Sequence, residues 1–126
     1  MKVFAIMRTR YVGLHAWPDA PEEQAYLRSP HRHVFHVKLC IEQPAEQLNG
    51  RNVEYHEVLA RFKETFDFDD WSRQTSCEFM AADLCRWAQH HYGSWREVSC
   101  RIMEDGENGA KVIIPGDDTT SSGAAT

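Results

Sequence analysis

Residues 31–42 read HRHVFHVKLCIE, and this stretch decides how the rest of the chain is interpreted. Side chains of a β-strand alternate between two faces with a period of two. One face of this stretch is therefore an apolar, core-facing row, made of Phe35, Val37, Leu39 and Ile41. His31 and His33 continue the same row at its beginning. A strand over these residues would place two imidazoles side by side at the entrance to a packed interior.

A third histidine suggests a metal site. His15 ends an earlier strand-like run, YVGLHAW, just before the long connection to His31. Catalytic zinc is held by three protein ligands and keeps one position open. We therefore expect zinc on His15, His31 and His33; the alternative is a polar hairpin without a metal. His36 falls on the opposite face of the strand and is expected at the sheet surface.

Composition bounds the class of protein. A chain of 126 residues fits one domain, which we place at residues 1–115, followed by a polar tail of small residues at 116–126 that is expected to be disordered. The formal net charge of −5 argues against a nucleic-acid partner, and we expect no Lys/Arg-rich patch. No apolar run reaches the length of a membrane span and no secretory leader is present, so we expect no membrane partner and a cytoplasmic protein. The four cysteines, which lack a CxxC pair, are interpreted as reduced thiols.

Periodicity predicts the elements in order. Strands are expected at residues 3–14 and 31–42, joined by a long loop over 17–30. Apolar residues at helical spacing predict a helix over 54–66. Thr75 with Glu78 three residues later is a capping-box pattern that opens a second helix, and Gly93 ends it. The inner face of that helix is expected to carry Cys77, Met80, Ala81, Leu84, Trp87, Ala88 and His91.

Two further strands are expected at residues 97–103 and 110–114, separated by the turn EDGENG. The resulting order is strand, strand, helix, helix, strand, strand. Grouped helices between pairs of strands predict the α+β class, with a four-stranded antiparallel sheet and two helices on one face. The other face of the sheet would be free for a ligand or a partner subunit.

The element order, His15 followed by His31-Arg32-His33, and Ser76-Cys77-Glu78 at the start of the second helix resemble a known family. It is the 6-pyruvoyltetrahydropterin synthase and 6-carboxytetrahydropterin synthase family, and the resemblance covers roughly residues 3–114. It implies the ββααββ tunnelling fold, zinc on the three histidines, and a homo-oligomer (trimer or hexamer) with sites between subunits. It also implies a small-molecule pterin ligand.

The resemblance assigns the ligand-binding residues. A glutamate at the end of the family's third strand grips the aminopyrimidine edge of the pterin, and Glu104 falls in that place. A carboxylate suits that edge because it accepts two parallel hydrogen bonds. The family motif that opens the second helix corresponds to Thr75, Ser76 and Glu78, which are therefore expected to bind substrate; the alternative is that they only cap the helix.

The departures from the family concern proton transfer. The family's basic cysteine lies four residues before the histidine pair, where this chain has Leu27, and the histidine of its Asp-His pair is missing. Arg32 also replaces the usual glycine of His-Gly-His. We expect a carboxylate, Asp69, Asp70 or Glu23, to substitute as the catalytic base in a zinc-dependent lyase acting on 7,8-dihydroneopterin triphosphate or a related pterin. For Asp69 and Asp70 the alternative is a solvated acidic loop. The alternative is a catalytically degenerate protein that binds zinc and a pterin or purine.

Overall fold

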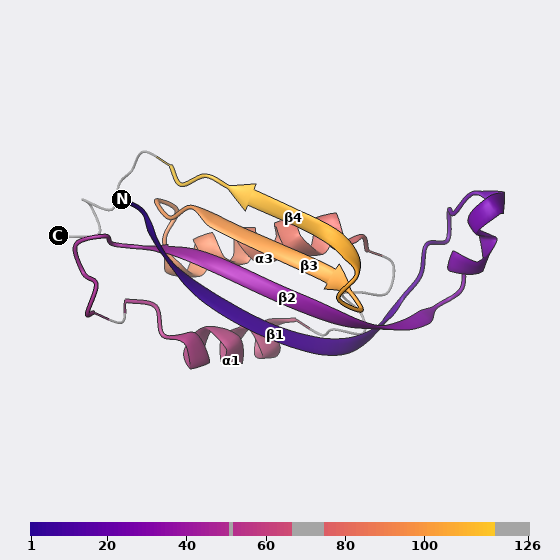
Figure 1. Cartoon of the computed structure of the whole chain (residues 1–126), viewed down its shortest axis with the longest axis horizontal. Helices are drawn as coiled ribbons and strands as arrows, with labels where there is room; N and C mark the ends of the chain where they lie inside the picture. The colour runs from indigo at the N-terminus through magenta and orange to yellow at the C-terminus, as the bar shows by residue number, and fades with distance from the viewer. Residues whose placement is uncertain (51, 67–74, 118–126) are drawn as a thin grey trace.

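The computed structural model describes residues 1–50, 52–66 and 75–117. Its elements are, in chain order, β1 (Val3–His15), the short 3-10 helix η1 (Glu22–Leu27), β2 (His31–Gln43), α1 (Tyr55–Thr65), α3 (Cys77–Tyr92), β3 (Val98–Glu104) and β4 (Asn108–Ile114). The strands form one antiparallel sheet in the order β1-β2-β3-β4 (Figure 1). The expected α+β class is confirmed.

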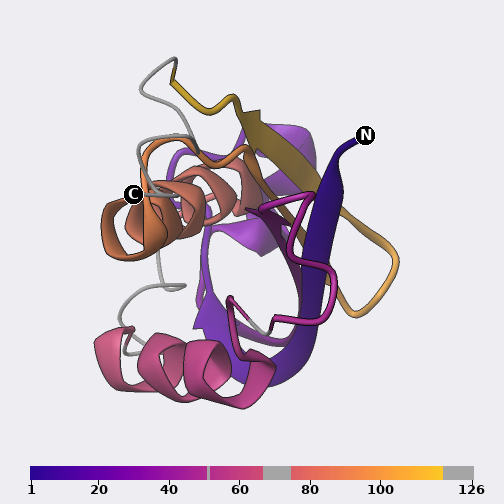
Figure 2. The ribbon, with the colours of Figure 1, turned by 90° about the vertical axis from the view of Figure 1, so that its left-hand side faces the viewer.

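The helices α1 and α3 lie against the same face of the sheet, and no helix of the described residues lies on the opposite face (Figure 2). The row predicted from HRHVFHVKLCIE forms the middle of the core: Phe35, Val37, Leu39 and Ile41 are all buried. Val58 and Phe62 of α1 pack into the same cluster, together with the apolar residues of α3. β2 therefore alternates as a half-buried antiparallel strand does, with apolar side chains inward and polar side chains outward.

The strands differ in length, so the sheet has a corner, which is the place where β3 ends and β1 and β2 continue. β1 and β2 pair over thirteen residues each, from Val3 opposite Gln43 to His15 opposite His31. β3 has only seven residues, and its pairing with β2 stops at Phe35 opposite Glu104. The β1–β2 ribbon therefore runs past the end of β3 and continues into an arm, residues 16–30, that projects from the body (Figure 1).

Three expectations about the helices need correction. The cap of α3 is Ser76, whose side chain accepts a hydrogen bond from the Phe79 N–H, so the Thr75–Glu78 capping box is wrong by one residue. His91 is exposed rather than on the inner face, and Cys85 is buried there instead. The long loop over 17–30 contains η1, although that segment shows no helical period in the sequence.

Two expectations lie outside the described residues: Asp69 and Asp70 fall in the segment 67–74, and most of the expected tail falls in 118–126. Gly93, at φ 131°, ends α3 as predicted. None of the described helices is long and apolar enough to cross a membrane.

The corrected cap can be tested by substitution. Ser76→Ala removes the acceptor for the Phe79 N–H, and we expect it to lower the free energy of unfolding by about 1 kcal/mol. Urea denaturation followed by circular dichroism measures this change. Ser94→Ala, at an exposed serine outside the helix, is the matched control and should have little effect. Equal losses in the two variants would contradict the assignment of Ser76 as the cap.

Candidate functional site

Three histidines meet at the corner where β1 and β2 outrun β3. His15 lies directly opposite His31 in the β1–β2 register, and His33 follows on the same face two residues along β2. The ring centroids of His31 and His33 are 4.6 Å apart, and that of His15 is 5.8 Å from His31 and 6.1 Å from His33. The register thus brings together the three residues that the sequence proposed as ligands.

Two of these histidines are held through Nδ1. His31 Nδ1 lies 2.8 Å from the carbonyl oxygen of Ser29, and His33 Nδ1 lies 2.6 Å from the Asp105 carboxylate. Because a carbonyl oxygen and a carboxylate only accept, Nδ1 of each ring is the donor, and in the neutral ring Nε2 keeps its lone pair. Metal-binding histidines typically donate their second ring nitrogen to such an acceptor, which fixes the ring orientation.

Asp105 is positioned by the turn between β3 and β4. Its backbone is left-handed, at φ 54°, and Gly106 follows at φ 73°. This conformation carries the Asp105 N–H to the carbonyl oxygen of Val34, at 2.6 Å, and lets the Asp105 carboxylate accept from the Val34 N–H, at 2.9 Å. These two hydrogen bonds extend the pairing with β2 by one residue beyond the end of β3. The hydrogen bond from Val34 and the contact with His33 lower the pKa of Asp105.

Glu104 lies between the histidines. Its carboxylate oxygens are 3.5 Å from His15 Nε2 and 3.7 Å from His33 Nε2. The Cys77 thiol donates a weak hydrogen bond to the same carboxylate, with 3.8 Å between sulfur and oxygen. Burial, and then the nearby carboxylates of Glu104 and Glu78, raise the pKa of Cys77 to about 12. The thiol is therefore protonated at neutral pH and can act as a proton donor.

The donor set fits a metal ion in its chemistry. His33 Nε2 is buried and has no hydrogen-bond partner, an unfavourable state for a polar atom unless a ligand satisfies it. Three neutral imidazoles are the ligand set of one type of catalytic zinc site. Among the described residues, no three histidine, cysteine or carboxylate side chains stand close enough, as they lie, to enclose an ion. The three histidines lie near one another, but their side chains would have to move to coordinate one ion.

A cavity of about 800 Å³ opens beside the histidines. Its lining brings together most of the residues predicted to bind substrate or metal: His15, His31, Thr75, Ser76, Glu78 and Glu104. Leu27, which stands where the related family has its basic cysteine, lines the same cavity and supplies no proton-transfer group. Ser76 and Glu78 are exposed at the start of α3, so their polar side chains face the solvent at this opening.

Sequence reasoning missed two residues of this site. Asp105 falls in a charged turn, and the Asp-Gly pair directly after a strand is the signal for left-handed backbone that could have identified it. Cys77 falls on the inner face of the predicted helix, and its place next to Glu78 in the motif that opens α3 is the signal that could have identified it. Nothing in the sequence indicates that either side chain contacts His33 or Glu104.

Comparison with models of known protein families gives no match, and comparison with curated proteins gives none either.

The Asp105 contact predicts a pH-dependent contribution to stability. Because the pKa of Asp105 is lower in the folded state, its contribution is complete above the unfolded-state value of about 3.9 and is lost as the pH falls through the folded-state value. Asp105→Asn should therefore destabilise the protein at pH 7, and its difference from wild type should shrink in acid. Urea unfolding at a series of pH values measures this; Glu107→Gln, in the same exposed turn, is the control. A difference that stays constant down to the acid limit would refute the assignment.

Proposed function

We propose that this chain is a zinc-dependent lyase of the 6-pyruvoyltetrahydropterin and 6-carboxytetrahydropterin synthase type, acting on 7,8-dihydroneopterin triphosphate or a related pterin. One observation carries the proposal: His31 and His33 are oriented through Nδ1 by Ser29 and Asp105, and His31 lines a cavity together with His15. His33 Nε2 is buried without a hydrogen-bond partner, with a Glu104 carboxylate oxygen 3.7 Å away, and a bound metal ion would satisfy this nitrogen.

His15, His31 and His33 would hold the zinc. When bound, zinc supplies a Lewis acid that polarises the side-chain oxygens of the substrate. The protein's own part is to orient the imidazoles, which the Ser29 carbonyl and the Asp105 carboxylate do for His31 and His33. The 800 Å³ cavity is of the size that small-molecule sites usually have.

Glu104 is the proposed anchor for the aminopyrimidine edge of the pterin. Its side chain is about a third exposed at the cavity and so is open to a ligand on one side. Thr75, Ser76 and Glu78 would contact the ligand from the start of α3. The Cys77 thiol, which is protonated and donates to Glu104, would help to orient that carboxylate toward the ligand. Asp69 and Asp70 remain the proposed bases.

A second candidate function is favoured by Leu27. The cavity carries an aliphatic side chain where the related enzymes have their base, and general acid–base chemistry needs a titratable group within reach. A protein that binds zinc and a pterin or purine without turnover fits this lining equally. The two candidates share the metal site and differ in whether the ligand is converted.

We also propose that the chain adopts the ββααββ tunnelling fold in a cytoplasmic homo-oligomer, a trimer or a pair of trimers. The sheet order leaves β1, with thirteen residues, and β4, with seven residues, as its edge strands. Exposed edges are usually paired or covered, and pairing β1 of one copy with β4 of the next would remove both.

The metal site predicts the behaviour of two histidine variants. His33→Ala removes a proposed ligand and should abolish stoichiometric zinc binding, measured by metal analysis of the purified protein. His36→Ala, on the same strand but the opposite face, is the matched control and should retain zinc. Asp105→Asn should lower zinc affinity by about 10- to 100-fold in a chelator competition, since it loosens the ring of His33. Unchanged zinc in His33→Ala would exclude the site.

The reaction predicts the release of triphosphate. Zinc-loaded protein mixed with 7,8-dihydroneopterin triphosphate should release inorganic triphosphate, and His33→Ala should not. Phosphorus NMR measures this release. Cys77→Ala should slow release by about tenfold while zinc content is unchanged, because Glu104 loses the hydrogen bond that orients it. Cys40→Ala, half-buried and outside the lining of the cavity, is the control. Tight pterin binding without release would instead establish the binding protein.

A further inference from the structure

We propose that the face of the sheet away from the helices is a second binding site, which takes the phosphate chain of a small oligophosphate, free or esterified. The inference is independent of the zinc and pterin proposals, because it rests on other residues. We use the name cationic row for four side chains on this face: Arg8, Lys38, Arg101 and Lys111.

The cationic row is created by the register of the sheet. Arg8 pairs with Lys38, Lys38 pairs with Arg101, and Arg101 pairs with Lys111, so one cation from each strand stands directly opposite the next. Adjacent strands are about 4.8 Å apart, and the row therefore extends about 14 Å across the sheet. Arg10 and His36 form the beginning of a parallel row, two residues along their strands.

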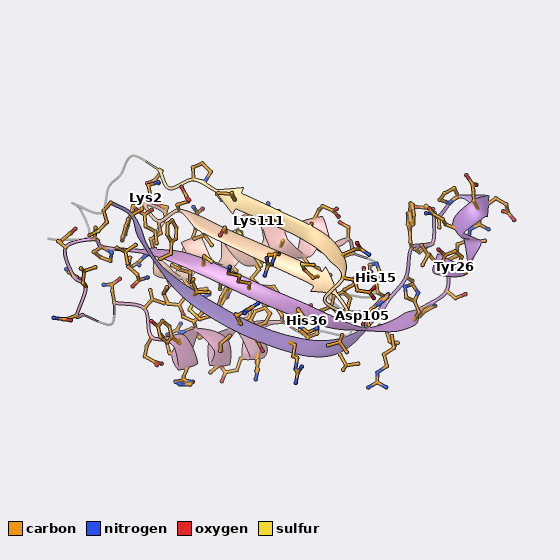
Figure 3. The ribbon with its side chains drawn as sticks, viewed as in Figure 1. Lys2, His15, Tyr26, His36, Asp105 and Lys111 are labelled. Atoms are coloured by element: carbon orange, nitrogen blue, oxygen red, sulfur yellow. The ribbon has the colours of Figure 1, made fainter. Side chains whose placement is uncertain are left out.

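Three members of the cationic row, Arg8, Lys38 and Arg101, line a hollow, and Lys111 stands next to Arg101 on β4. A depression of about 460 Å³ is lined by Arg8, Arg10, His36, Lys38 and Arg101, with Met103 among the apolar members. None of its lining residues is acidic. The ion pairs of the described residues involve other side chains, such as Lys2 with Glu97 and Arg61 with Glu57. In Figure 3, His36 and Lys111 appear on the open side of the sheet, with the helices behind it.

A purely structural role does not explain this arrangement. Like charges directly opposite one another on neighbouring strands destabilise a sheet. The chain has a net charge of −5, with 19 acidic residues that might have been placed among these cations. Cross-strand pairs of opposite charge would stabilise the same face. A face that instead collects cations gains stability only when an anion binds to it.

The size and the donors of the hollow favour an oligophosphate. Arginine presents a planar fork that matches two phosphate oxygens, and lysine adds a compact charge that suits the same group. A phosphate chain concentrates several negative charges within a length comparable to the row. The hollow is too small for a nucleic-acid duplex to enter, and the acidic remainder of the surface would repel a long polyanion.

This site is separate from the histidine cluster. His33 and Phe35 point to the helix side of β2, and His36 and Lys38 point to the other side, because side chains alternate along the strand. No residue lines both cavities. Loss of one site should therefore leave the other intact.

The test is calorimetric titration of the full-length protein with inorganic tripolyphosphate at low ionic strength. Lys38→Gln/Arg101→Gln should weaken binding by about tenfold or more, since two charge-assisted contacts are lost. Lys63→Gln/Arg86→Gln changes the net charge equally at exposed positions on α1 and α3, and should bind like wild type. His33→Ala should also bind tripolyphosphate like wild type, because the cationic row does not depend on a zinc ion at the histidines.

The outcomes discriminate clearly. Weaker binding in the first double variant alone supports the site, and comparison of ATP with tripolyphosphate then distinguishes an esterified chain from a free one. Binding that is absent in wild type, equal in both double variants, or lost only in His33→Ala overturns the proposal. If Lys38→Gln/Arg101→Gln changes the sedimentation coefficient without ligand, the face is a contact between copies of the chain and the proposal is overturned. Tighter binding of duplex DNA than of tripolyphosphate also overturns the proposal. The first double variant should unfold at no lower urea concentration than wild type, because it relieves repulsion.

Discussion

The antiparallel register of β1 and β2 is the constraint on which the rest of the structure depends. With His15 opposite His31, Phe35 and its apolar neighbours face the helices, and Arg8 and Lys38 face outward. A slip of one residue in either strand would exchange its two faces and bury cations in the core. Burial of the apolar row therefore selects this pairing, and the same pairing assembles the histidines on one face and the cationic row on the other.

The unequal lengths of the strands localise the candidate site. β1 and β2 are continuous ribbons with a single alternating pattern, and β3 ends at Glu104. The left-handed turn at Asp105 closes the gap by bonding to Val34, and its carboxylate reaches His33. Non-glycine residues at positive φ are uncommon and mark positions where the backbone is adapted to a purpose. Here that conformation supports both the end of the sheet and the orientation of one imidazole.

Local pattern was sufficient for the class of fold and most of its elements. Alternation in 31–42 and helical spacing in 54–66 identified β2 and α1 to within a residue or two, since burial of one face dominates both. The cap of α3 was misplaced because Thr75 and Ser76 are both good cap residues, and only the burial of Cys77 and Met80 sets the rotation of the helix. The sequence did not predict the cationic row, because its four residues are far apart along the chain and become neighbours only in the sheet.

The sequence by itself determined which residues of β2 turn inward, and hence the two-layer architecture and the grouping of His31 with His33. It did so because strand and helix periods are local properties of the backbone. Only the tertiary structure decided that Asp105 orients His33, that Cys77 contacts Glu104, and that Arg8, Lys38, Arg101 and Lys111 stand in one row. Those contacts join segments far apart in the chain, and their geometry follows from strand lengths and register, which the packing of the whole core sets.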